Sequence, residues 1–292
     1  MENSSVSPSR EYDLMERAGD YPERAGPPER SLVVCSQPRS GSTLLGEAIY
    51  FAGGLGNPLE YFHAGFRPKF ERRWKPASFS DYVARLYRSR TDPSGVFGLK
   101  LFWVDVVDLL HECAPDEFAF LDWRHPGDLA PETHRRIFGI LRDFIPNPTF
   151  VFLTRRDEIR QAVSHVVAGR SRAWRQFPRQ ARKDLDAEYE FHRILQYLGV
   201  IQRHNGHWRD FFRANALACH RIVYEDLEAD YEGTLRKFFA AVGRPDAPIP
   251  PPRLQKQADA RSEALVQRFR AEFRQRASAT PPPPPAPDTP SN

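Results

Sequence analysis

A short loop after an apolar stretch carries the residues best suited to bind an anion. The segment SLVVCSQPRSGSTLLGEAIYF contains, at its polar centre, Arg39, Ser40, Gly41, Ser42 and Thr43. The arginine supplies a permanent charge with forked donors, and the hydroxyls supply further donors. The glycine lets the backbone approach a ligand closely, and a helix beginning here would aim its unpaired amides at the same point. This pattern predicts a phosphate cradle. A capped helix after a strand is the alternative, because Ser and Thr are common helix caps.

The loop differs from the P-loop of nucleoside triphosphatases. That motif requires GxxxxGK[ST], in which a Lys reaches the terminal phosphates and a hydroxyl binds magnesium. No Lys precedes Ser42 here, and the loop begins with Arg39. A small-molecule kinase is therefore the weaker reading of this segment.

A second strand–helix junction could hold another anion. In TFVFLTRRDEIRQAVS, an apolar run ends at Thr154, Arg155 follows it, and Ser164 lies on the next helical segment. Ligands of parallel sheets bind at the carboxyl ends of the strands. By itself the signal is weak, since the arginines here could pair with Asp157 or Glu158.

Short apolar runs alternate with helical patterns along the chain. Strands are expected at 32–35, 149–153 and 221–224, with a possible fourth at 96–101. Helices are expected at 42–51, 157–168 and 231–242, and a longer one at 185–214, broken near Asn205-Gly206. This alternation predicts an α/β fold with a parallel sheet flanked by helices.

The ends of the chain have a different composition. Residues 1–30 are polar and Pro-rich, and 277–292 include five consecutive prolines, so we expect disordered extensions around one domain at 31–276. The N-terminus has no apolar signal region, and no run reaches the roughly 18 apolar residues of a membrane span. We therefore expect a cytoplasmic protein without a transmembrane segment.

By themselves, the net charge and the positions of the Cys and His residues exclude few classes of function. The net charge is +4 and the pI about 9.0, which fits either a phosphorylated ligand or nucleic acid. No basic block resembles a nucleic-acid tail, so a non-catalytic nucleic-acid-binding protein is the weaker alternative. Cys35, Cys113 and Cys219 form no CxxC pair and are expected to be core thiols. His204 and His207 are expected to be a surface pair, and no metal site is predicted.

Several segments together resemble a known family. PRSGSTLL, followed by a strand-end Arg and AVS, resembles the sulfotransferases that use 3′-phosphoadenosine-5′-phosphosulfate (PAPS). SQPRSGSTLL, GNPLEYFH, FGLKLFW, RRDEIRQAVS and KQADARSEALVQRF occur in this order and resemble the bacterial trehalose sulfotransferase family. The resemblance implies a P-loop-like sulfotransferase fold, PAPS as co-substrate, a hydroxyl acceptor on a sugar or glycolipid, and a homodimer.

The resemblance also implies roles for particular residues. Residues 39–43 would hold the 5′-phosphosulfate, Arg155 and Ser164 the 3′-phosphate, and Lys256 and Arg261 would belong to a loop that closes over the cofactor. Glu60 would be the base that takes the acceptor proton, with Glu47 as a competitor. Transfer would be in-line, with Arg39 stabilising the departing phosphate.

The acceptor site is predicted less sharply than the cofactor site. Lys100 could orient the acceptor or pair with Asp105 or Asp108, and Tyr61 and Phe62 could stack on a sugar. Pro38, Asn57, Leu59 and Leu265 depart from the family pattern. A sulfotransferase-fold protein that has lost activity is therefore a further alternative, although the proposed cofactor residues and the base are all present.

Overall fold

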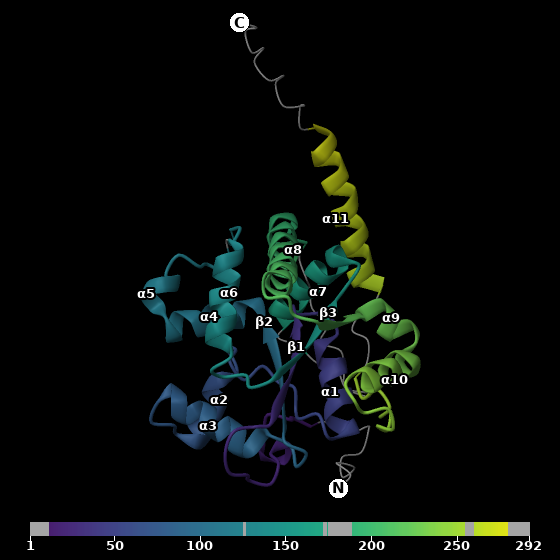
Figure 1. Cartoon of the computed structure of the whole chain (residues 1–292). Coiled ribbons are helices and arrows are strands. Elements are labelled where there is room, and N and C mark those ends of the chain that lie inside the picture. Colours follow the sequence, from purple (N-terminus) through teal and green to yellow (C-terminus); the bar gives the residue numbers. More distant parts are fainter. Residues whose placement is uncertain (1–11, 125–126, 172–173, 175–188, 255–259, 280–292) are drawn as a thin grey trace, which may run out of the picture.

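Four parallel strands form the centre of the described molecule (Figure 1). The computed structural model describes residues 12–124, 127–171, 174, 189–254 and 260–279. Within these residues the strand order is β2-β1-β3-β4, and every neighbouring pair is parallel. The strands are β1 (Arg30–Ser36), β2 (Val96–Phe102), β3 (Pro148–Thr154) and β4 (Cys219–Val223). The predicted α/β class with a parallel sheet is confirmed, including the strand at 96–101.

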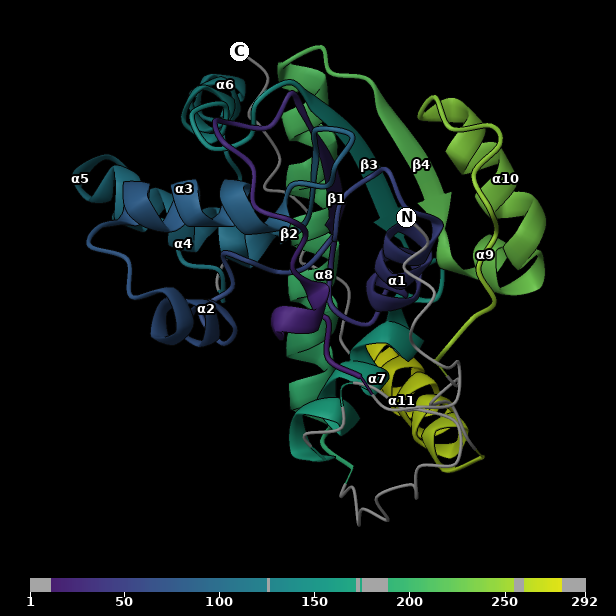
Figure 2. The same cartoon turned by 90° about the horizontal axis from the view of Figure 1, so that it is seen from below.

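Helices cover both faces of the sheet. In chain order they are α1 (Ser42–Ala52), α2 (Arg67–Trp74), α3 (Phe79–Arg90), α4 (Trp103–Cys113), α5 (Pro115–Phe118), α6 (Pro131–Leu141), α7 (Glu158–Ser171), α8 (Phe191–Ala214), α9 (Tyr224–Ala229), α10 (Tyr231–Ala241) and α11 (Ala260–Ala279). Figure 2 shows α9 and α10 beside β4 at one edge and α2 to α5 beyond β2 at the other. The sequence patterns had not predicted α2 to α6, α9 or α11.

Alternate residues of the central strands enter two separate cores. Val33 and Phe150 pack with Trp208 of α8, whereas Val34 and Val151 pack in the cluster that contains residues of α1 and α10. Successive side chains of a strand point to opposite faces, so a strand covered on both sides must be apolar throughout. This explains why the strands appear in the sequence as continuous apolar runs.

The order of the strands places a change in the direction of winding beside β1. The chain passes from β1 to β2 on one side and then crosses to β3 on the other side of β1. In open α/β sheets, ligands bind where the direction of winding reverses, at the carboxyl ends of the strands. Here that point lies between the ends of β1 and β3, at Ser36 and Thr154.

Two expectations about helices and thiols were wrong. Helix α8 continues through Asn205-Gly206, because Asn205 is buried and donates from Nδ2 to Glu158 Oε1 at 3.2 Å. This tertiary contact offsets the roughly 1 kcal/mol that a glycine costs a helix. Cys113 is exposed and Cys219 is half-buried, so only Cys35 is a core thiol.

The described part of the expected N-terminal extension packs against the domain. Leu14 and Met15 are buried in the core, and Arg90 of α3 is fully buried beneath them. Arg90 donates to the carbonyl of Leu14 at 2.6 Å and to that of Met15 at 2.8 Å, and it pairs with Asp20 at 2.8 Å. Two apolar residues and one buried cation thus anchor a segment that its polar composition had marked as disordered.

The C-terminal end of the folded domain also differs from the expected one. Helix α11 runs through the expected domain end at 276 as far as Ala279, and its last turns point away from the sheet (Figure 1). The proline run lies outside the described residues. No helix in the described ranges has the length and apolar character needed to cross a bilayer.

The buried position of Arg90 leads to a stability prediction. We expect Arg90→Ala to lower the free energy of unfolding by about 3–5 kcal/mol, because it leaves buried carbonyls and Asp20 without their partner. Arg88→Ala, at an exposed position of the same helix, should change it by less than about 0.5 kcal/mol. Urea unfolding of both variants measures the difference, and equal losses would contradict the anchoring role.

Candidate active site

The loop after β1 is a tight left-handed turn that leads into α1. Arg39 has φ 65° and Gly41 has φ 88°, and the helix begins at Ser42. A Cβ placed on Gly41 would lie 2.4 Å from Cδ2 of Tyr224, the first residue of α9. Only glycine therefore combines this backbone conformation with the close approach to Tyr224. The sequence predicted that Gly41 lets the backbone approach a ligand. In the structure glycine is required at this position by its positive φ and by the nearby Tyr224 ring.

The structure brings together the three residues expected at the two phosphate positions. Arg39 Nε donates to Ser164 Oγ at 3.0 Å, and Arg155 Nη1 donates to the carbonyl of Arg39 at 3.2 Å. Arg155 follows β3 directly and Ser164 lies on α7, so the group spans the crevice between β1 and β3. Arg155 and Ser164 follow Arg39 by 116 and 125 positions in the sequence, and the fold brings all three residues to one site.

Two partly desolvated cations lie close together at this point. Burial, together with the smaller effect of the nearby Arg155 charge, lowers the pKa of Arg39 to about 10. Burial also lowers the pKa of Arg155, which Tyr224 and Glu225 partly offset. The Arg155 guanidinium lies 4.8 Å from the Tyr224 ring centroid, and its Nε lies 3.7 Å from Glu225 Oε1. Two like charges in a crevice favour an anionic ligand, which would stabilise both.

The remaining loop residues fit the same ligand class. Ser40 is buried, and its Oγ has no hydrogen-bond partner among the described residues. Ser42 is buried at the first position of α1 and Thr43 is half-buried beside it. A buried hydroxyl and the amides of a helix N-terminus are donors that a phosphate oxygen can accept from. This donor set fits the phosphate groups of PAPS.

A buried histidine supports the loop from α8. His204 lies with Nδ1 3.1 Å from the Gln37 side-chain amide and Nε2 3.1 Å from the carbonyl of Trp123. Burial lowers the pKa of His204 to about 3, so the ring is neutral at pH 7 and carries a single N–H. His207 is also buried and stacks on Trp103 at 4.9 Å. The expectation of a surface histidine pair was wrong, because both side chains pack inward.

Glu60 lies in a buried ion pair that sequence reasoning did not find. Its Oε1 is 2.7 Å from Lys100 Nζ, and the Lys100 amide donates to the carbonyl of Leu59 at 2.9 Å. Lys100 pairs in register with Val34 of β1, two residues before that strand ends at Ser36. The pair is therefore held beside the start of the loop. A lysine inside an otherwise apolar strand was the signal that could have predicted it.

The other acidic candidates have different partners. Glu47 is buried and its Oε2 accepts from Tyr12 Oη at 2.5 Å. Asp105, which was considered as a partner of Lys100, accepts from the Phe102 amide at 2.8 Å through Oδ2. Burial raises the pKa of Asp105, and the charge of Glu60 contributes to that increase. Glu60 is thus the carboxylate that pairs with the strand lysine.

Tyr61 and Phe62 do not form an exposed sugar-binding surface. Both are buried in the main core, and Tyr61 stacks on Phe97 at 5.5 Å while donating from its hydroxyl to the carbonyl of Asn57 at 2.7 Å. Their position next to Glu60 in the sequence suggested the acceptor site, but the aromatic rings are occupied by protein contacts. These two assignments were wrong.

The expected closing segment lies at the edge of the described structure. Lys256 falls outside the described residues, and Arg261 is exposed in the first turn of α11. Helix α11 is joined to α7 through Arg160, which pairs with Glu263, and through Arg270, whose Nη2 lies 2.8 Å from Asp157 Oδ2.

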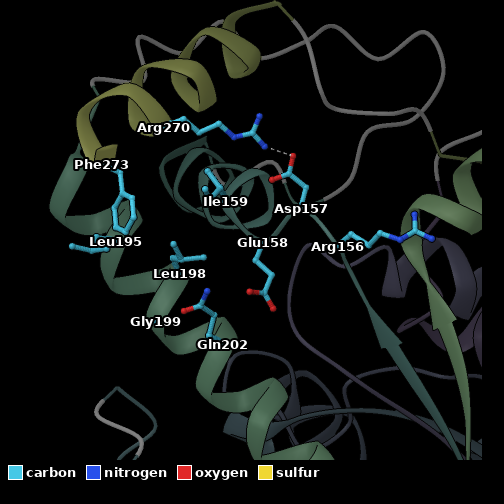
Figure 3. Close-up of a pocket in the computed structure, with 10 residues that line it drawn as sticks. All are labelled: Arg156, Asp157, Glu158, Ile159, Leu195, Leu198, Gly199, Gln202, Arg270 and Phe273. Atoms are coloured by element: carbon cyan, nitrogen blue, oxygen red, sulfur yellow. Dashed lines mark hydrogen bonds and ion pairs between the residues drawn. The ribbon is translucent and has the colours of Figure 1, made fainter. Parts of the chain in front are cut away.

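A groove between α7, α8 and α11 lies apart from this loop. Figure 3 shows its lining residues, which are Arg156, Asp157, Glu158, Ile159, Leu195, Leu198, Gly199, Gln202, Arg270 and Phe273. None of the expected cofactor or acceptor residues belongs to this set. Within the described part of the chain, no group of three or more His, Cys, Asp or Glu residues is arranged to hold a metal ion.

Comparisons with known proteins identify the family to which the chain is similar. The family model described as Stf0 sulphotransferase matches residues 31–272. A trehalose 2-sulfotransferase of Mycobacterium tuberculosis (strain ATCC 35801 / TMC 107 / Erdman) is 28% identical over 269 residues, covering 83% of this chain and 95% of the relative. One of Mycolicibacterium smegmatis (strain ATCC 700084 / mc(2)155) is 27% identical over 272 residues, with the same coverage. A solved sulfotransferase domain from the Synechococcus PCC 7002 olefin synthase covers 90% of this chain and 99% of its own, at 13% identity and a TM-score of 0.39.

The contact between Gly41 and Tyr224 gives a direct test of the loop geometry. We expect Gly41→Ala to abolish binding of adenosine 3′,5′-bisphosphate, because the new methyl group must displace the loop or Tyr224. Gly243→Ala is the matched control, since Gly243 also has positive φ but has nothing within 4 Å of a new Cβ. The control should lose about 1 kcal/mol of stability and keep binding. Calorimetric titration of both folded variants measures this, and retained binding by Gly41→Ala would contradict the cradle.

Proposed function

The chain belongs to the Stf0 sulphotransferase family, and from this premise we propose that it moves the sulfuryl group of PAPS to a hydroxyl of a carbohydrate or glycolipid. The observation that carries the proposal is the group formed by Arg39, Ser164 and Arg155, linked at 3.0 and 3.2 Å across the crevice. Trehalose is the first acceptor to test, because two curated relatives are named for transfer to it.

The charge pattern of the crevice supports PAPS as the donor. PAPS carries anionic groups at both the 5′ and the 3′ position, and the site offers one desolvated arginine for each. Arg39 and the loop donors would hold the 5′-phosphosulfate, and Arg155 with Ser164 would hold the 3′-phosphate. An ordinary adenine nucleotide lacks the 3′ group and would leave Arg155 with a smaller electrostatic gain on binding.

Glu60 is proposed as the general base. When PAPS is bound, it supplies a sulfuryl group whose bond to the 5′-phosphate oxygen breaks as the acceptor oxygen attacks sulfur. The Glu60 carboxylate takes the proton of that acceptor hydroxyl. Lys100, 2.7 Å from Glu60, orients the carboxylate and places a positive charge beside the transferred group. The pair explains why a charged lysine occurs within a buried strand.

Arg39 stabilises the leaving group without donating a proton. Its pKa of about 10 is still above neutral pH, so the guanidinium stays protonated and acts through its charge and hydrogen bonds. A kinase-type reaction is the second candidate, because a phosphate cradle alone does not distinguish the two. Its loop would need a lysine at the position that Gly41 occupies before Ser42.

Nucleotide specificity tests the donor assignment. We expect adenosine 3′,5′-bisphosphate to bind tightly without metal, and adenosine 5′-monophosphate to bind weakly. Arg155→Ala should remove the preference for the 3′-phosphate. Arg156→Ala is the control, since the neighbouring Arg156 side chain is 60% exposed and pairs with Asp226. Calorimetry of the wild-type protein and both variants with each of the two nucleotides measures this preference. A preference for ATP with magnesium in the wild-type protein would favour the kinase reading instead.

Turnover separates the two carboxylate candidates. We expect Glu60→Gln to lower kcat by roughly 10²–10⁴-fold, the usual contribution of a general base, with unchanged affinity for adenosine 3′,5′-bisphosphate. Glu47→Gln should keep most activity, because its hydrogen bond with Tyr12 can be replaced by the amide oxygen. Labelled PAPS and a panel containing trehalose, glucose, maltose and a trehalose glycolipid provide the assay. Near wild-type turnover of Glu60→Gln, or a larger loss in Glu47→Gln, would reject Glu60 as the base.

A further inference from the structure

The acceptor site lacks the aromatic surface that the sequence had suggested. Tyr61 and Phe62 are buried in the core, so neither can contact a sugar face. Trp174 is different, because 43% of it is exposed, whereas Trp103 and Trp208 are buried. A single exposed tryptophan is ordinary on a protein surface, so the position of Trp174 relative to Arg39 decides whether its ring could serve the site.

Two contacts hold Trp174 against the cofactor residues. Arg39 Nη1 donates to the carbonyl of Trp174 at 2.9 Å. The Trp174 ring lies edge to face with the His165 ring, with 5.5 Å between centroids. His165 directly follows Ser164, whose hydroxyl accepts from the other side of the same arginine at 3.0 Å. The backbone and the ring of Trp174 are therefore both positioned by the phosphate site.

The support behind Trp174 is itself fixed and uncharged. The His165 ring lies 4.1 Å from that of Tyr197 on α8, which connects Trp174 through α7 to the body of the domain. Burial lowers the pKa of His165 to about 4, and the charges of Arg39 and Arg193 add to this effect. The imidazole is neutral at pH 7, so the support behind the indole is an aromatic ring without charge.

The atoms of Arg39 distinguish the two sides of the site. Nε faces Ser164, which is assigned to the 3′-phosphate, whereas Nη1 faces Trp174. Under the proposed function Arg39 stabilises the departing 5′-phosphate, which assigns its Nη1 side, where the Trp174 carbonyl lies, to the transfer point and its Nε side to the 3′-phosphate. A sugar ring presents apolar C–H groups on its face and hydroxyls on its rim, and an indole ring can cover the former while its N–H bonds to the latter.

We propose that Trp174 contacts the acceptor and helps determine its specificity by packing its indole ring against the face of a sugar. This inference rests on the proposed function, because it requires a carbohydrate acceptor. It assigns the acceptor to the side of Arg39 opposite Ser164, between the loop after β1 and the end of α7.

The test compares acceptor and nucleotide binding in the same variants. For Trp174→Ala we expect the KM of the best sugar in the panel to rise roughly tenfold, with little change in affinity for adenosine 3′,5′-bisphosphate. Trp174→Phe, which keeps a flat ring, should recover most of the loss. Phe273→Ala is the control, because Phe273 is similarly exposed at 41% but lies on α11 in the separate groove. Calorimetric titration of the bisphosphate complex with the same sugar gives a readout independent of turnover.

The possible outcomes separate the two proposals. Weaker nucleotide binding with an unchanged sugar KM would move Trp174 to the adenine side and overturn the inference. Unchanged values for both ligands would make Trp174 a surface residue and also overturn it. If the wild-type protein binds the bisphosphate but sulfates no sugar, the carbohydrate proposal fails first and the inference fails with it.

Discussion

The placement of two partly buried arginines, Arg39 and Arg155, in contact with each other is the constraint around which the site is built. The parallel sheet places the loop after β1 and the end of β3 side by side, and the left-handed turn at Arg39 directs its carbonyl toward Arg155. Each charge disfavours the other when both are partly buried, and the charge of Arg155 contributes to the lowered pKa of Arg39. The Tyr224 ring and Glu225 offset part of that cost, and a doubly anionic ligand would offset the rest. The fold thus holds a binding site in a state that favours its ligand.

A second arrangement of buried charges holds the proposed base. Asn57 donates from Nδ2 to the carbonyl of Gly19 at 3.1 Å, in the N-terminal segment that Arg90 also anchors. The chain then continues through Pro58 and Leu59 to Glu60, which meets Lys100 on β2. The described part of the N-terminal segment thus helps to fix the loop that carries this carboxylate. Asn57, which departs from the family pattern, has a structural role in this chain.

Local patterns predicted the geometry around the loop after β1 better than the surroundings of Glu60. The loop after β1 could be predicted because its donors are consecutive, and Arg155 because it follows an apolar strand. The Glu60–Lys100 pair could not, since its members are 40 positions apart and only the sheet register brings them together. The prediction for Tyr61 and Phe62 was wrong because the sequence next to a functional residue does not show whether an aromatic side chain packs into the core or faces the site. The break expected in α8 failed for a related reason, since the contact that secures Asn205 comes from Glu158 on another element.

The C-terminal helix has a consequence for how the protein is made. Val266 and Phe269 of α11 complete the apolar cluster between α7 and α8, and Phe269 stacks on Phe191 at 5.0 Å. Helix α7 carries Ser164, so one wall of the proposed nucleotide site is fully packed only after the residues up to Phe269 have left the ribosome. Because β1 and β3 are also more than a hundred residues apart, the nascent chain must wait for distant segments before its crevice can form. A shortened product that lacks α11 would expose this apolar face and be a substrate for chaperones and proteases.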